Sequence, residues 1–333
     1  MTGPPLPATT DGLVTIRAPE PGDADVLVAG RDEEFHRFLG PGADQPRPTG
    51  CVLVAGRVAG WVDYDRDQGW LLTGEVNLGY NVFAAYRGSG YATRAVRLLL
   101  HHLALRTSHR TATLLIDPAN DRSLALAARL GAARAAHPDG AYFKLAVPPL
   151  SYSDGIVTIR RLRPDDLDAD LAAKDDEQIR WMWLPGQRDT WEAMTDAARR
   201  AHAAASLRQR IEAFGAGPSW AFAADAPGAS YAVYVECDLA SGNAPAGEAN
   251  ISYSCHPAYR GHGYVSRAVR LISCFLHDHT GARQAHLLID PDNAASLRVA
   301  LAVGARRRGQ SVNESGQAMV RYVLALGDQR AGA

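Results

Sequence analysis

The sequence predicts two mixed α/β domains in tandem. Its 333 residues are enough for two domains of ordinary size, each with its own core. The segment 75–131 aligns without a gap with the segment 248–304, and about half of the aligned residues are identical. A period this long indicates duplication of a whole domain rather than a solenoid of short repeats. Each copy also alternates β-rich runs with segments of helical period, which is typical of a mixed α/β fold.

The domain limits follow from the repeat. Residues 14–17 recur as 157–160, at a smaller offset than the main block, so the second copy carries 30 more residues between its first strand and that block. A segment containing Pro and Ser joins the copies. We expect a flexible tail over 1–12, a first domain over 13–147, a linker over 148–155, a second domain over 156–326 with an extra helix at 189–214, and a flexible tail over 327–333.

Within the first copy, apolar periodicity and turn residues predict the elements in order. The helix at 22–39 has Asp23 as its candidate cap, and Gly56 and Arg57 form the turn of a hairpin. The extra helix of the second copy has Thr190 as its candidate cap. The predicted strands are 13–17, 51–55, 58–64, 75–83, 111–116 and 142–147, and the predicted helices are 22–39, 90–105 and 123–130.

Composition excludes several classes of function. Lys and Arg total 35 and Asp and Glu total 36, which gives no general attraction to nucleic acid or to an anionic membrane. No apolar run is long enough to span a bilayer, and the first ten residues lack the features of a signal peptide. The four cysteines form no CxxC pair and no metal-ligand spacing with His. We therefore expect a cytoplasmic protein with free thiols and no metal.

A glycine-rich loop is the most informative motif. Residues 87–92, Arg-Gly-Ser-Gly-Tyr-Ala, lie between a predicted strand and a predicted helix. Glycines let an anion approach backbone N–H groups, and the first turn of a helix offers unpaired donors. A single such loop is as consistent with a plain turn, but this one recurs at 260–265, and each copy is followed by Ile-Asp-Pro-x-Asn-x-x-Ser. The sequence matches neither a Walker loop nor a dinucleotide fingerprint.

The pattern Arg-x-x-Gly-x-Ala at 87–92 resembles the acyl-CoA signature of the GNAT superfamily of N-acyltransferases. The blocks 75–131 and 248–304 resemble the branch that includes the ribosomal-protein alanine acetyltransferases. This resemblance implies two GNAT-like domains, each a mixed, mostly antiparallel sheet with a splayed central strand and flanking helices. It implies transfer of an acetyl group from acetyl-CoA, or of an acyl group from another acyl-CoA, to a primary amine of a small molecule or peptide N-terminus. Neither nucleic acid nor membrane is an expected partner, and the chain is expected to be a monomer or a homodimer.

The resemblance also implies which residues bind the cofactor. The splayed strand would bind the pantetheine arm through its backbone, the glycine loop would take the pyrophosphate, and an Asn after the next strand would lie near the thioester. In the first copy these residues are Asn81, Val82, Phe83, Arg87, Gly88, Ser89, Gly90, Tyr91, Ala92, Thr93 and Asn120. In the second copy they are Ser254, Cys255, His256, Arg260, Gly261, His262, Gly263, Tyr264, Val265, Ser266 and Asn293.

The expected chemistry is direct attack of the amine on the thioester. Amines are mostly protonated at neutral pH, so a base is required. Glu75 and Glu248 match a position that often supplies the base in the family. Many members supply the acid for the departing thiolate from a Tyr four residues after the Ser, but Ala127 and Ala300 stand there. Ser123 and Ser296 are then the candidate acids, with water as the alternative.

Simpler roles remain open for several of these residues. The two glutamates could be surface charges, the two serines could cap helices, and His256 and His262 could be spacers. Three tryptophans in the second copy, Trp181, Trp183 and Trp191, could line an acceptor pocket or pack in a core.

Each copy departs from the family pattern at a different position. Val265 replaces the small Ala92, but only the second copy has the segment 189–214 that usually builds the acceptor wall in the family. We favour the second copy for catalysis. A non-catalytic acyl-CoA sensor and a transferase for a longer acyl or aminoacyl group are the alternative functions.

Overall fold

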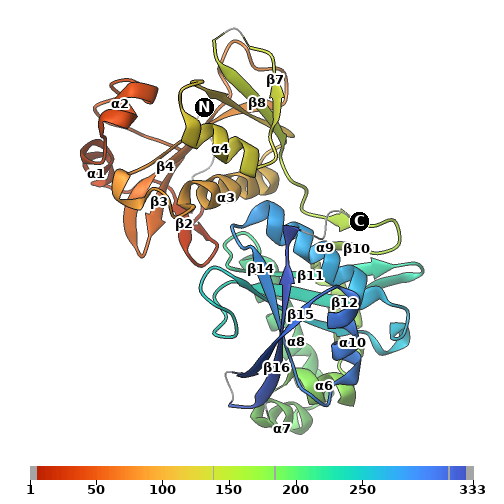
Figure 1. Ribbon diagram of the computed structural model, residues 1–333. Helices are drawn as coiled ribbons and strands as arrows, with labels where there is room; N and C mark the ends of the chain where they lie inside the picture. Colours follow the sequence, from red (N-terminus) through yellow and green to blue (C-terminus); the bar gives the residue numbers. More distant parts are fainter. Residues whose placement is uncertain (1–5, 138, 184, 314–315, 328–333) are drawn as a thin grey trace. The chain divides into compact units, whose positions relative to one another are not determined.

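A computed structural model describes residues 6–137, 139–183, 185–313 and 316–327. The chain divides into two compact units, one ending at Pro149 and the other beginning at Leu150, except that 279–281 group with the first. Each unit is built on one mixed sheet with helices beside it (Figure 1). Two tandem domains of mixed α/β structure are thus confirmed.

The first unit contains an eight-stranded sheet in the order β1-β2-β3-β4-β5-β6-β8-β7 within the described residues. Only β5 and β6 run parallel, and all other neighbours are antiparallel. The strands are β1 Thr9–Thr10, β2 Val14–Arg17, β3 Gly50–Val54, β4 Arg57–Asp65, β5 Glu75–Val82, β6 Thr111–Ile116, β7 Ala133–Ala135 and β8 Ala141–Ala146; the helices are α1 Asp23–Ala29, α2 Glu33–Leu39, the short 3-10 turn η1 Ala84–Tyr86, α3 Tyr91–Arg106 and α4 Asp121–Arg129.

The second unit repeats this arrangement in the order β15-β16-β14-β13-β12-β11-β10-β9, with β13 and β14 as its parallel pair. Its strands are β9 Tyr152–Ser153, β10 Thr158–Arg161, β11 Ser219–Ala226, β12 Ala229–Asp238, β13 Ala249–Cys255, β14 Gln284–Ile289, β15 Arg306–Val312 and β16 Ala318–Ala325; its helices are η2 Pro164–Asp166, α5 Leu167–Ala172, α6 Asp176–Met182, α7 Pro185–Ala193, α8 Asp196–Ala213, η3 Pro257–Tyr259, α9 Tyr264–His279 and α10 Ala294–Ala302.

The parallel strand pair of each sheet separates after a short paired stretch. β5 and β6 pair only from Glu75 opposite Thr111 to Asn77 opposite Thr113. β13 and β14 pair only where Ala249 and Asn250 face Ala285 and His286. Beyond these points β5 and β13 run on without a partner on that side toward the glycine loops. The predicted splayed central strand is therefore present in both domains.

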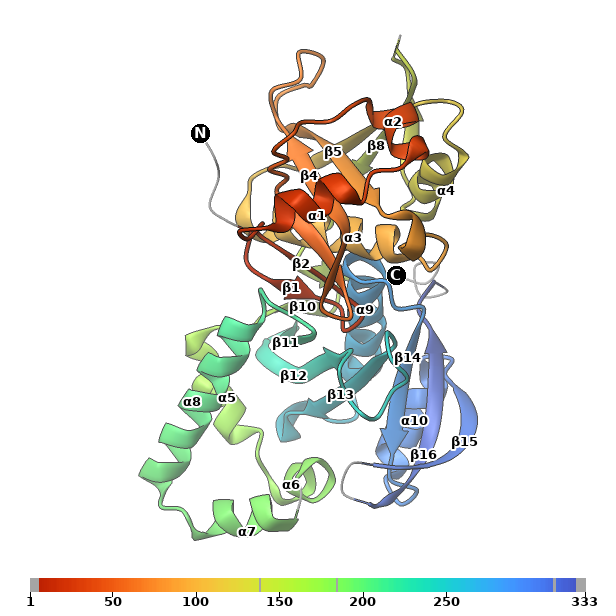
Figure 2. The ribbon, with the colours of Figure 1, turned by 90° about the vertical axis from the view of Figure 1, so that its left-hand side faces the viewer.

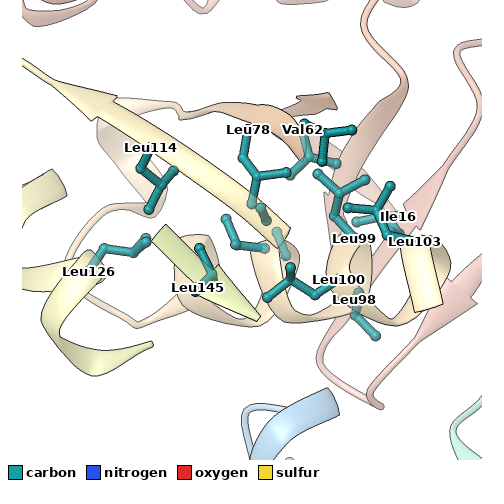
Figure 3. Packing of buried hydrophobic residues seen from close by; sticks show 14 of the residues in the cluster. Ile16, Val62, Leu78, Leu98, Leu99, Leu100, Leu103, Leu114, Leu126 and Leu145 are labelled. Atoms are coloured by element: carbon teal, nitrogen blue, oxygen red, sulfur yellow. The ribbon is translucent and has the colours of Figure 1, made fainter. Parts of the chain in front are cut away.

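An apolar core fixes this geometry in the first domain. Side chains of α3 such as Leu99 and Leu103 pack under Val62 of β4 and Leu78 of β5 (Figure 3). Leu99 and Leu103 are fully buried. Burial of one such side chain contributes about 2 kcal/mol. The core holds α3, and with it the glycine loop at its start, against the sheet.

Several predicted limits differ from the structure. The helix expected over 22–39 is two helices, because Gly30 ends α1 and Asp32 caps α2; Asp23 is no cap and instead pairs with Arg17. The helix expected over 189–214 is also two, with Thr195 rather than Thr190 as the cap of α8.

Parts expected to be irregular are ordered. The predicted tail 1–12 includes β1 and the buried Leu6, and the predicted linker 148–155 includes β9. Apolar burial of Leu6 and pairing with β2 and β10 account for this order. The tail expected at 327–333 lies outside the described residues from 328 onward.

Candidate functional site

Both glycine loops adopt the conformation that an anion site requires. Gly88 and Gly90 have φ values of 85° and 80°, and Gly261 and Gly263 have 81° and 75°. This left-handed region strongly favours glycine. A Cβ atom added at any of the four would meet nothing within 4 Å, so the space above each loop is open. Gly90 caps α3 with no side-chain hydrogen bond, which leaves the N–H groups of the first turn for a ligand.

The arginine of each loop braces the loop. Arg87 donates from Nη1 to Asp32 Oδ2 (2.5 Å) and Glu34 Oε2 (2.8 Å), and from Nε to the backbone oxygen of Val82 (2.8 Å). Its positive charge is thus already neutralised by carboxylates. These contacts indicate that Arg87 braces the loop rather than adding charge to it.

Arg260 repeats the carboxylate contacts in the second domain. It donates from Nη1 to Asp175 Oδ2 (2.7 Å) and Glu177 Oε2 (2.8 Å), and from Nη2 to Asp175 Oδ1 (2.7 Å). Asp175 also caps α6 by accepting from the N–H of Gln178, as Asp32 caps α2. One clamp therefore ties the glycine loop to a helix cap in each domain.

The asparagines after the parallel strands cap helices. Asn120 Oδ1 accepts from Ser123 N and Asn293 Oδ1 accepts from Ser296 N, both at 3.0 Å. Capping in α4 and α10 is therefore done by the asparagine, and neither serine is the capping residue. The hydroxyls of Ser123 and Ser296 are not used for this purpose.

A pocket of about 710 Å³ opens in the second domain between the glycine loop and the separated strands. Its walls come from α6, from β12, β13 and β14, from the start of α9 and from α10. Of the predicted residues, ten line it: Ser254, Cys255, Arg260, Gly261, Gly263, Tyr264, Val265, Ser266, Asn293 and Ser296.

Three predicted residues of the second domain do not line this pocket. His256 accepts through Nδ1 from the N–H of Ala258, and His262 stacks on Tyr264. Glu248 accepts through Oε2 from the N–H groups of Arg283 (3.2 Å) and Gln284 (2.6 Å). The Glu248 carboxylate thus holds the entry to β14 beside β13, away from the pocket.

Glu75, the counterpart of Glu248, is held in an ion pair. Its Oε1 accepts from Lys144 Nζ at 2.5 Å and its Oε2 from the N–H of Leu72 at 3.0 Å. Burial alone would raise the pKa of Glu75, but these hydrogen bonds outweigh it and hold the pKa below its usual value. A carboxylate stabilised in this way is a weak base.

A different glutamate, Glu236 of β12, lines the pocket. It lies opposite Ser252 of β13 in the sheet register. Tyr234 donates a hydrogen bond from its hydroxyl to Glu236 Oε2. Burial raises the pKa of Glu236 above its usual value, although the bond from Tyr234 and the charge of Arg210 act against this. A carboxylate with a raised pKa accepts a proton more readily than an ordinary surface glutamate.

Tyr253 lines the same pocket from the other face of β13, because successive side chains of a strand alternate. Its hydroxyl donates to the backbone oxygen of Ser296 at 3.4 Å. Burial raises the pKa of Tyr253 to about 12, against the effect of Ser296, so the phenol stays protonated. Ala300, where the resemblance would place a tyrosine, is fully buried. Tyr253 and Ser296 instead bring hydroxyls to the pocket wall.

The three tryptophans divide between the two roles. Trp181 lines the pocket. Trp183 and Trp191 pack edge to face with ring centroids 5.1 Å apart, and Trp191 is buried. Met182 joins Trp181 at the pocket wall, so α6 brings apolar side chains there together with the polar Glu177 and Gln178.

Sequence reasoning missed the carboxylate clamp and Glu236. The clamp had a signal, since Asp32-x-Glu34 recurs as Asp175-x-Glu177 at the same offset as the first strands. Glu236 had none, because it lies outside the gapless block and meets the pocket only through pairing of β12 with β13.

Two general features complete the site. In the described ranges, no group of His, Cys, Asp and Glu side chains could hold a metal ion. Among the helices of those ranges, none is both long and apolar enough to cross a membrane.

A family model for the acetyltransferase (GNAT) domain matches the chain twice, at residues 14–133 and 157–306. No curated protein matches the chain. Several solved structures match about half of it. An acetyltransferase of the GNAT family from Bacillus anthracis is 15% identical over 54% of this chain and 99% of its own, with a TM-score of 0.42.

Two further structures are similar to the same extent. The ribosomal-protein-S5-alanine acetyltransferase from Vibrio fischeri is 16% identical over 54% of this chain and 98% of its own, with a TM-score of 0.42. RimJ from Mycobacterium smegmatis, in complex with CoA-disulfide, is 15% identical over 54% of this chain and 85% of its own, with a TM-score of 0.41.

Proposed function

The chain belongs to the GNAT acetyltransferase family, and on that basis we propose that its second domain transfers an acetyl group from acetyl-CoA to a primary amine of a small molecule or peptide N-terminus. One observation carries this proposal: a half-buried carboxylate, Glu236, lines the same pocket as the glycine loop and the splayed strand.

The residues present fit the pyrophosphate and pantetheine of CoA. The loop at Gly261 and Gly263 is open above its backbone, and the helix start behind it favours an anion. The separation of β13 from β14 exposes strand backbone to a pantetheine arm. Acetyl-CoA bound there would supply an activated thioester. Cys255 would not compete as a nucleophile, since burial raises the pKa of its thiol to about 11.

Glu236 is the proposed general base. A primary amine has an unperturbed pKa of about 8 to 10 and must lose a proton before it attacks. The pKa of Glu236 is raised toward the pKa of the amine, which favours transfer of the proton from the amine to the carboxylate. Tyr234 holds one carboxylate oxygen, so the proton would go to Oε1. Glu248 remains the alternative base.

Tyr253 and Ser296 are the proposed proton donors for the departing thiolate. Both line the pocket on the side of α10, across β13 from Glu236. Glu236 would take a proton from the amine on one face of the strand, and Tyr253 or Ser296 would give its own proton to the sulfur on the other face; exchange with solvent would then restore both groups. Water is the alternative donor.

For the first domain we propose CoA binding without transfer. Its glycine loop and clamp match those of the second domain. Its candidate carboxylate is engaged, because Glu75 pairs with Lys144.

The test is incubation of the full chain with acetyl-CoA and a panel of amines, with thiol release as the readout. The panel holds peptides with free N-termini, aminoglycosides and small alkylamines, and propionyl- and succinyl-CoA are run in parallel to cover other acyl groups. Turnover lost in Glu236→Gln and retained in Glu248→Gln and Glu75→Gln supports the assignment. Turnover lost only in Glu248→Gln moves the base to that residue. CoA binding with no turnover of any amine would instead favour an acyl-CoA sensor.

A further inference from the structure

The segment that only the second domain carries does not wall the pocket. Among the described residues of 189–214, none lines it. Instead α8 packs beside α5 and along β11, behind the strand that bears Glu236 (Figure 2). The resemblance had implied an acceptor wall, so this segment needs another explanation.

α8 brings one cation, Arg210, to the strand that bears Glu236. The Arg210 guanidinium lies over the Tyr234 ring, 5.0 Å from its centroid. Stacking of this kind is favourable when the pair is shielded from water. Tyr234 is itself buried, with 8% of its surface exposed.

Asp170 of α5 holds Arg210 in place. Arg210 Nη2 donates to Asp170 Oδ1 at 3.4 Å. The same oxygen accepts from the Tyr231 hydroxyl at 2.6 Å, and Asp170 Oδ2 accepts from Lys174. Burial would raise the pKa of Asp170, but the two cations hold it below its usual value. Asp170 therefore remains ionised and keeps Arg210 turned toward Tyr234.

This chain of contacts ends at the pocket. The Tyr234 hydroxyl donates to Glu236 Oε2. In the described part of the protein, no hydrogen bond of the structure occupies Glu236 Oε1. One oxygen is thus fixed and the other is available to a ligand.

The first domain has no such arrangement. Asp63 of β4 lies opposite Gly79 of β5, and Glu236 lies opposite Ser252, the residue that aligns with Gly79 in the repeat. Asp63 is thus the positional counterpart of Glu236, but it binds Thr49 and the N–H of Tyr64. Between α2 and β3 the first domain has no helix that could supply an arginine.

We propose that Arg210 and Tyr234 are positioning residues for Glu236, and that the segment inserted in the second domain serves to hold them. Arg210 keeps the Tyr234 hydroxyl on Oε2, and Tyr234 in turn presents Oε1 to the acceptor amine. The proposal rests on the role of Glu236 as base, and it adds how that carboxylate is oriented and tuned.

The charges around Glu236 set the direction of the effect. Tyr234 and Arg210 stabilise its ionised form, whereas Asp238 on the same strand and burial destabilise it. Removing the Tyr234 hydroxyl or the Arg210 charge should therefore raise the pKa of Glu236. The loss of one hydrogen bond to a charged group corresponds to a shift of about one pH unit.

The test follows the Glu236 carboxyl directly, by carbon NMR of protein labelled at the glutamate carboxyl carbons. The Glu236 signal is assigned from its absence in Glu236→Gln. The variants are Tyr234→Phe, Arg210→Gln and Arg210→Lys. Arg200→Gln is the matched control, because Arg200 lies on the same helix in an exposed pair with Asp168. Thermal unfolding checks that each variant is folded.

We expect Tyr234→Phe and Arg210→Gln to titrate about one unit above the wild type. Arg210→Lys keeps the charge and should stay within a few tenths of a unit, as should Arg200→Gln. Titration of Tyr234→Phe within a few tenths of the wild type overturns the proposal, and this variant suffices if Arg210→Gln does not fold.

The NMR titration is independent of turnover. If no amine is acetylated but the shifts occur, the proposed function fails and the positioning role stands. If Glu236→Gln abolishes turnover while the pKa of Glu236 in Tyr234→Phe and Arg210→Gln equals the wild-type value, only the positioning role fails.

Discussion

A Gly→Ala substitution in the glycine loop should lower CoA affinity more than its effect on the free energy of unfolding can explain. Gly263 has a φ of 75°, and a Cβ there would meet no protein atom within 4 Å. Gly263→Ala should therefore lose only the strain of a left-handed alanine, about 1 to 2 kcal/mol. Gly304, after α10, has a φ of 80° and the same open surroundings, so Gly304→Ala should lose a similar amount.

The two variants should differ in CoA affinity. The open space above Gly263 is where the proposed pyrophosphate would lie, so the added methyl group would displace it from the N–H groups of α9. We expect at least a tenfold loss of affinity, about 1.4 kcal/mol, in Gly263→Ala and none in Gly304→Ala.

Calorimetric titration with CoA measures this, with thermal unfolding in parallel. Because the first domain carries the same loop, the wild type should bind at two sites, and Gly90→Ala with the control Gly131→Ala should report on the other one. Equal CoA affinity in Gly263→Ala and Gly304→Ala, with both folded, would refute the phosphate cradle.

Three further outcomes follow from the contacts described. Arg260→Ala should weaken CoA binding about 5- to 30-fold by releasing the loop and two carboxylates beside the phosphate site, whereas Arg260→Lys should fall between it and the wild type; calorimetry measures both. The pKa of Glu75 is lower in the folded state, so its pair with Lys144 stabilises the first domain at pH values above the unfolded pKa of about 4.5. This stability should be lost as the pH falls through the lower pKa of the folded state. Acid unfolding should therefore depend less on pH in Glu75→Gln than in the wild type over that range. Leu99→Ala should destabilise the first domain by about 2 to 5 kcal/mol, since Leu99 is fully buried, and denaturant titration should leave the transition of the second domain in place.

The features that could be predicted from sequence are those encoded locally. A glycine loop before a helix and a buried strand each depend on a few neighbouring residues, and the repeat shows each of them twice; the helix caps after the parallel strands, for which Ser123 and Ser296 were the candidates, are Asn120 and Asn293. The helix expected over 22–39 was wrong at Gly30 because helical period continues across a break that only the cap at Asp32 reveals. Boundaries of this kind depend on which chain segment packs beneath them.

The acceptor side could not be predicted for a different reason. Glu236 reaches the pocket because β12 pairs with β13, and Arg210 reaches Tyr234 because α8 packs against β11. The packing of α8 joins segments that are distant in sequence and has no counterpart in the described residues of the first domain, and the residue that matches Glu236 there is Asp63, which lies outside the gapless block of the repeat. The residues predicted instead, Glu248 and Glu75, are near the splayed strand in sequence but point to other partners.

Comparison of the two domains distinguishes the glycine-loop side of the site, which is the same in both, from the carboxylate side, which differs. The glycine loop, its arginine clamp and the Asn cap have the same contacts in both domains, as expected if both bind the same carrier. Glu236 and its counterpart Asp63 have different hydrogen-bond partners. The 30 extra residues of the second domain lie between Glu177 of the clamp and β12, the strand that bears Glu236. In the function proposed above, CoA binding and choice of acceptor would thus depend on separate parts of the fold. A variant that removes Arg210 should change proton transfer in the second domain without changing CoA binding in either one, which calorimetry on Arg210→Gln would measure.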